Sequence, residues 1–118
     1  MATISDVSII NSNSAKAKPV EAGFERIICG ESLCGSKTLT VYRRTVLEGR
    51  RFATQAKDDY HLVYVMETSK EGLISFNNET HPTEDGAGVL LAPGELAQFE
   101  ASGSDLELLH MVAPKPPA

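Results

Sequence analysis

Short apolar runs alternate with turn residues along most of this chain. After residue 24 no stretch longer than about two turns shows the spacing of a helix. Glycine, asparagine, aspartate and proline separate the runs, as in Asn77-Asn78 and Pro93-Gly94. The runs predict strands at 24–29, 38–47, 51–55, 60–67, 72–76, 88–92, 96–101 and 106–112. Short strands at this spacing are typical of an all-β sandwich or barrel.

The strand predicted at 60–67 carries apolar residues on both of its faces. Alternation puts His61, Val63 and Val65 on one face and leaves mostly apolar residues on the other. The strand at 106–112 behaves in the same way and places His110 on one of its apolar faces. A strand that is apolar on both faces needs a cover on each side. We therefore expect the outer face to meet a second sheet or a second copy, and a homodimer is the favoured assembly.

Length, composition and charge argue for a single globular domain without a nucleic-acid or membrane partner. The 118 residues fit a single domain, and a composition of 42% hydrophobic and 23% charged residues is that of a globular protein. The formal net charge of −5 argues against a nucleic-acid partner, because such binding depends on clustered Lys and Arg. No segment approaches the roughly 20 apolar residues that span a bilayer, and no secretory signal is recognised. We expect no membrane partner and a cytoplasmic location.

The pattern divides the chain into three parts. Residues 1–22 are rich in Ser, Asn, Ala and Lys, and we expect them to form an arm that docks on a partner subunit. Residues 23–113 contain the predicted strands and form the β-domain. Residues 114–118 are proline-rich and form a tail, because proline cannot donate to a strand ladder.

The two cysteines, Cys29 and Cys34, fit neither a redox C-x-x-C motif nor a paired zinc framework. Two free thiols in a β-turn are the expectation for a reducing cytosol. A local disulfide or a reactive thiol is the alternative.

Two segments, 49–67 and 88–99, resemble the two halves of the cupin signature. The run Val63-Tyr-Val-Met-Glu67 is similar to the strand that closes the first motif, and Pro93-Gly94 is similar to the start of the second. The resemblance covers about two thirds of the chain. It implies a single-domain, cupin-like jelly-roll β-barrel that binds a small molecule in the barrel mouth.

The metal ligands of that family are mostly missing here. In the register set by 63–67, Gln55 and Lys57 stand where the resemblance implies two histidines, and His61 stands where it implies a glutamate. Ala97 replaces the histidine of the second motif. A metal centre of the family type needs imidazoles and a carboxylate, so we expect no metal and no other cofactor. A one-residue slip in register would place a different set inside.

Lys57 and His61 are the candidate catalytic groups, with Tyr60 beside them. Histidine titrates near neutral pH, and a lysine in an apolar pocket can serve as acid, base or imine former. The alternatives are a solvated turn for Lys57, a hydrogen-bonded core residue for His61 and a packing role for Tyr60.

Candidate substrate-binding residues lie on other strands. Arg43 and Arg44 are adjacent, so one of them must face opposite to the other, and an inward arginine would bind a carboxylate or phosphate. A surface salt bridge is the alternative outcome. His110 could join His61 and Gln55 to bind substrate or to form a weak metal ligand set. His81 is expected to be exposed in a turn.

The resemblance implies a superfamily that includes dioxygenases, isomerases, lyases, cyclases and non-enzymatic binders, so the fold alone selects none of them. Without a metal, proton transfer is the chemistry that remains. The sequence favours a small-molecule enzyme: an isomerase, lyase or cyclase. A non-catalytic or structural cupin is one alternative, and a metalloenzyme with an unorthodox ligand set is the other.

Overall fold

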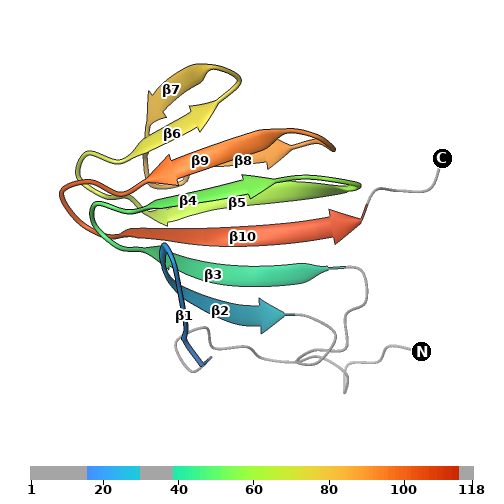
Figure 1. The fold of residues 1–118 in the computed structure, drawn as a ribbon, viewed down its shortest axis with the longest axis horizontal. Coiled ribbons are helices and arrows are strands. Elements are labelled where there is room, and N and C mark those ends of the chain that lie inside the picture. The colour runs from blue at the N-terminus through green and yellow to red at the C-terminus, as the bar shows by residue number, and fades with distance from the viewer. Residues whose placement is uncertain (1–15, 30–38, 115–118) are drawn as a thin grey trace.

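A computed structural model describes residues 16–29 and 39–114, and every regular element in them is a β-strand (Figure 1). The strands are β1 (Lys18–Val20), β2 (Gly23–Cys29), β3 (Thr40–Val46), β4 (Arg51–Gln55), β5 (Asp59–Glu67), β6 (Leu73–Phe76), β7 (Glu79–Pro82), β8 (Gly88–Leu91), β9 (Leu96–Glu100) and β10 (Leu106–Pro114). The predicted all-β fold is confirmed. These ranges contain no helix with the length and hydropathy needed to cross a membrane.

The strands form two antiparallel sheets that pack as two layers. The first sheet has six strands in the order β1-β2-β3-β10-β5-β8, and the second has four in the order β4-β9-β6-β7. Figure 1 shows β10 lying between β3 and β5, its two partners in the first sheet. This is the predicted jelly-roll architecture, with each sheet hydrogen-bonded within itself.

The predicted strands correspond to β2 through β6 and β8 through β10, while β1 and β7 were not predicted. β7 is an edge strand whose four residues are all exposed, so it lacks an apolar signal. Asn77 and Asn78 have φ values of 53° and 61° and turn the chain from β6 into β7. His81 is exposed as expected, but it lies in β7 rather than in a turn.

The N-terminal segment is described only in part. β1 pairs with β2 of the same chain at the edge of the first sheet. Residues 1–15, which include most of the expected arm, and residues 115–118 of the expected tail lie outside the described residues. The docking of the arm on a partner subunit stays a prediction.

The core lies between the two sheets and is built from alternate positions of their strands. Its fully buried members include Val46, Val63, Val65, Leu91, Ala97, Phe99, Ala101, Leu106 and Leu108, each with 0% exposure. Burying one such Leu or Val side chain contributes roughly 1.5 to 3 kcal/mol. The apolar residues that alternate along β5 and β10 are therefore buried where they face inward, as expected.

Cys29, at the end of β2, is disulfide-bonded, so the prediction of free thiols is wrong. Cys34, the other cysteine in the sequence, lies outside the described residues. The spacing excluded known motifs, but it did not exclude a disulfide, because closing a short loop has a low entropic cost. A disulfide is uncommon in a reducing cytosol, so this bond gives no support to the expected cytoplasmic location.

Candidate functional site

Polar side chains enter the interior at one end of the two-layered fold. This end, called the site end below, is where β2, β4 and β10 finish and β3 and β5 begin, on the right in Figure 1. Two of the buried polar residues found there are His61, 8% exposed, and His110, 2% exposed. The site end is therefore chemically different from the apolar core that it adjoins.

Strand alternation brings these side chains inside. His110 follows Leu106 and Leu108 at intervals of two along β10, so all three face inward and all three are buried. On β5 the same rule places His61 on the face of Val63. Val63 is the cross-strand partner of His110. The two histidines thus lie on neighbouring strands at adjacent inward positions.

A chain of hydrogen bonds links the inward groups, and we call Asp59, His61, His110, Arg44 and Thr54 the interior network. Arg44 Nε donates to His110 Nδ1 at 3.0 Å, and His110 Nε2 lies 2.9 Å from His61 Nδ1. His61 Nε2 lies 3.1 Å from Asp59 Oδ1. Thr54 Oγ1 lies 3.0 Å from His61 Nδ1. Four strands therefore contribute to one continuous polar chain.

Aromatic and acidic neighbours hold Arg44 in place. Its guanidinium carbon lies 4.4 Å from the ring centre of Tyr42 and 4.5 Å from that of Phe52. Arg44 Nη1 lies 3.4 Å from Glu25 Oε1. Burial lowers the pKa of Arg44, while Glu25 and Tyr42 act to raise it. The guanidinium stays charged near neutral pH because the ordinary pKa of arginine is above 12.

His110 is held in its neutral form. Burial is the main cause that lowers its pKa to about 3, followed by the positive charge of Arg44 and the proximity of His61, with Asp59 opposing. The His110 ring also packs 5.7 Å from Tyr42 and 5.7 Å from Phe52, measured between ring centroids. His110 is therefore a fixed, uncharged part of the site near neutral pH.

The two adjacent arginines face opposite ways, as expected, and Arg44 is the inward one. Arg43 lies on the outer face of β3, where its Nε is 3.2 Å from Glu107 Oε2. Thr45, on the same outer face, donates to Glu107 Oε1 at 2.7 Å. Of the two arginines only Arg44 joins the interior network.

Besides Arg43, three predicted site residues do not join the interior network. Gln55 is exposed on the outer face of β4, and the inward position belongs to Thr54. Lys57 is exposed in the turn before β5, where its backbone amide donates to Asp59 Oδ1 at 2.9 Å. Tyr60 alternates with His61 and so lies on the opposite face of β5. The interior placement expected for Gln55 is wrong, because the actual register of β4 differs by one residue from the one read off the sequence.

Three residues of the site were missed. Asp59 precedes His61 by two positions, so strand alternation would have found it if the strand had been started one residue earlier. Thr54 could be found only with the correct assignment of which β4 residues face inward. Glu25 became recognisable only through the pairing of β2 with β3, which sets it opposite Arg44.

The residues that stand where the resemblance to cupins implies a metal site do not fit a metal ion. Ala97 is fully buried there and offers no lone pair. His110 Nδ1 accepts from Arg44, and the ring nitrogens of His61 already contact His110, Thr54 and Asp59. The Arg44 guanidinium adds a positive charge beside them. Within residues 16–29 and 39–114 no three His, Cys, Asp or Glu side chains gather as metal ligands would.

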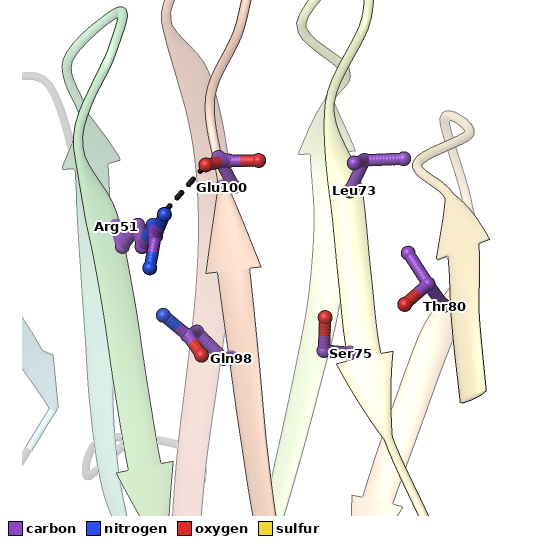
Figure 2. A pocket seen from close by; sticks show the side chains of 6 residues that line it. All are labelled: Arg51, Leu73, Ser75, Thr80, Gln98 and Glu100. Atoms are coloured by element: carbon purple, nitrogen blue, oxygen red, sulfur yellow. Dashed lines mark hydrogen bonds and ion pairs between the residues drawn. The ribbon is translucent and has the colours of Figure 1, made fainter. Parts of the chain in front are cut away.

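A shallow hollow of about 210 Å³ lies elsewhere, on the outer face of the second sheet (Figure 2). It is lined by Arg51, Leu73, Ser75, Thr80, Gln98 and Glu100. Arg51 Nε is 3.1 Å from Glu100 Oε1. Figure 2 shows this ion pair as a dashed line, with the side chain of Gln98 below it. The hollow is separated from the interior network by the sheet itself.

Comparison by sequence finds no relative: no family model matches the chain, and no curated protein matches it.

Comparison by structure finds clear neighbours. A Thermotoga maritima protein described as a predicted oxalate decarboxylase has a TM-score of 0.77 at 16% identity, over 91% of this chain and 99% of that one. The polyketide cyclase RemF from Streptomyces resistomycificus has a TM-score of 0.73 at 16% identity, over 94% and 82%. The cupin domain of Schizosaccharomyces pombe Cnp3 has a TM-score of 0.69 at 8% identity, over 87% and 71%. At these identities the likeness concerns architecture alone, and it shows that this chain has the cupin fold.

Proposed function

We propose that this protein binds a small organic molecule at the site end and catalyses a proton transfer, as an isomerase, lyase or cyclase, without a metal. The observation that carries the proposal is the interior network, which connects a partly exposed carboxylate to two buried imidazoles and a buried guanidinium. Titratable groups with perturbed pKa values cluster at functional sites, and this network joins His110, whose pKa is lowered, to a carboxylate that reaches solvent.

Asp59 is the group that meets the ligand in this proposal. Its side chain is 30% exposed, and its Oδ1 accepts from both His61 and the Lys57 amide. Oδ2 is then available to take a proton from a ligand carbon next to a carbonyl group. The bonding electron pair stays on the ligand as an enolate, and the proton returns to a different ligand atom. His61 keeps its hydrogen bond to Asp59 Oδ1 both before and after Asp59 takes the proton.

The similarity in fold to a polyketide cyclase supports the reaction class and not the substrate. The Thermotoga neighbour is described as a decarboxylase, so the same architecture is associated with more than one chemistry. Within the proposed function, Asp59 and His61 replace the earlier pair of His61 and Lys57, since Lys57 lies outside the interior network.

A non-catalytic small-molecule binder is the second candidate. The observation that favours it is the burial of His61 and His110, because hydrogen-bonded buried histidines also occur where no chemistry takes place. The interior network would then serve only to satisfy polar groups and to fix the shape of the site.

The test is deuterium uptake from D2O into a panel of small cyclic ketones and hydroxyketones, followed by NMR. Asp59→Asn and His61→Gln should each lower the protein-dependent exchange rate by roughly 10² to 10⁴. Lys57→Met is the matched control and should leave the rate within about twofold, because its side chain is exposed. Binding of a panel compound without any exchange above buffer would favour the binder instead.

We also propose that the protein is a homodimer that uses the outer face of the first sheet. Tyr64, Met66 and Leu90 are 39%, 40% and 61% exposed there, which leaves apolar surface uncovered in a single copy. Light scattering at micromolar concentration should give twice the 12.7 kDa chain mass. A mass of one chain, unchanged by Leu90→Lys, would contradict the proposal.

A further inference from the structure

We propose that Arg44 is a positioning residue that acts through His110 to hold His61 as the neutral tautomer with its proton on Nε2. The proton acceptor that the interior network presents at the site end is then the carboxylate of Asp59, and not an imidazole. The inference rests on the proposed function only for the role of Asp59, since the arrangement of protons can be established without a substrate.

The first step is fixed by the chemistry of arginine. A guanidinium has only N–H donors and no acceptor. Arg44 Nε lies 3.0 Å from His110 Nδ1, so this nitrogen of His110 must present its lone pair. An imidazole with a lone pair on Nδ1 is neutral and carries its one proton on Nε2. Arg44 therefore determines the tautomer of His110.

The second step follows along the hydrogen bond between the rings. His110 Nε2, which carries the proton, lies 2.9 Å from His61 Nδ1, so His61 Nδ1 must accept. Thr54 Oγ1 lies 3.0 Å from the same nitrogen, and its hydroxyl can rotate to donate as well. Both neighbours of His61 Nδ1 are donors, so the proton of His61 resides on Nε2.

The third step identifies Asp59 as the group that can accept a further proton. His61 Nε2, with its proton, lies 3.1 Å from Asp59 Oδ1 and donates to it. A second proton on His61 would have to sit on Nδ1, facing the N–H of His110, and would break the hydrogen bond between the rings. Asp59 is the only member of the interior network that can take a proton while every other bond is kept.

The neighbours of Arg44 hold its guanidinium in the orientation that donates to His110. Its side chain is 14% exposed and pairs with Glu25, and its guanidinium carbon lies 4.4 Å and 4.5 Å from the ring centres of Tyr42 and Phe52. A guanidinium held by two rings and a carboxylate loses little further entropy when it orients His110. The orientation therefore exists before any ligand arrives.

The consequence for the ligand is a preference in chemical class. A carboxylate with a free oxygen recognises a group that donates a hydrogen bond or a proton, such as a hydroxyl or an acidic C–H beside a carbonyl. It repels a ligand carboxylate placed at the same point. The positive charge of Arg44 does not offset this, because Arg44 is already paired with Glu25.

The experiment is nitrogen-15 NMR of the histidine rings in the full chain near pH 7, which distinguishes a protonated from an unprotonated ring nitrogen. In the unmodified protein, His61 and His110 should both carry their proton on Nε2. Arg44→Met keeps the length of the stem and removes the donor, so the proton of His110 can move to Nδ1. His61 Nδ1 then faces a lone pair and should gain a proton, while Nε2 of His61 keeps the proton that Asp59 accepts. Arg44→Gln returns an N–H donor near the Nε position and should restore the original tautomers.

Arg43→Met is the matched control, because it removes a guanidinium from the next residue on the opposite face of β3 and should leave both rings unchanged. A proton on Nδ1 of His61 in the unmodified protein, or unchanged tautomers in Arg44→Met, would overturn the inference. If Arg44→Met does not fold, a proton on Nδ1 of either histidine in the unmodified protein would still overturn the inference. Neither outcome depends on whether the protein turns over a substrate.

Discussion

The two ends of the same three strands differ in what fills the space between the sheets. On β3, β5 and β10 the inward positions at the far end are apolar, as at Val46, Val65 and Leu106, each fully buried. Two to four residues along each strand the inward positions become Arg44, His61 and His110. Backbone pairing continues through both ends, with one register shift between β10 and β5 at Glu107 and Leu108. Side-chain chemistry therefore separates core from site.

The comparison shows two ways of filling an interior. At the far end, stabilisation comes from close packing and the removal of apolar surface from water, which has no direction. At the site end each polar group must find a partner, because an unsatisfied buried donor or acceptor costs about 1 to 3 kcal/mol. The far end should respond to changes in volume, and the site end to changes in protonation.

The largest expected effect is at the far end. Leu106→Ala removes a fully buried side chain and should lower the free energy of unfolding by about 3 kcal/mol, because it leaves a cavity between the sheets. Urea denaturation measures the change. Leu96→Ala is the control and should cost less than about 0.5 kcal/mol, since Leu96 is 53% exposed and lies on the second sheet, away from the proposed dimer face. Equal costs for the two would mean that the packed interior is not where the structure has it.

A smaller effect is expected from pH at the site end. The pKa of His110 is lowered from 6.5 to about 3, so between these values the unfolded chain binds a proton that the folded chain does not. Stability from this group is complete above about pH 6.5 and is lost as the pH falls. Between pH 7 and pH 5 the loss should be about 2 kcal/mol.

The measurement is urea denaturation at a series of pH values for the unmodified protein and for His110→Gln. Glutamine does not titrate, so the variant should lose less stability between pH 7 and pH 5, while contributions from carboxylates remain in both proteins. Parallel pH profiles for the two would contradict the neutral, buried state of His110.

The sequence determined the strands that carry an apolar signal and missed those that do not. The runs at 60–67 and 106–112 alternate strongly, and β5 and β10 occupy nearly the same residues. β7 is polar and exposed throughout, so only its pairing with β6 makes it a strand. The turn at Pro93-Gly94 was recognisable from the Pro-Gly pair. Gly94 adopts φ 91° there, a conformation that glycine tolerates.

For the site, the sequence by itself placed His61 and His110 on apolar faces of their strands, and it established that Arg43 and Arg44 must face opposite ways. Only the tertiary structure decided that Arg44 is that residue, that Thr54 and not Gln55 points inside, and that Asp59 and Glu25 complete the set. The reason is physical: alternation along a strand fixes which residues share a face, because it depends on local geometry. Which face is buried, and which strand lies opposite, depend on a register set by contacts between residues far apart in the chain.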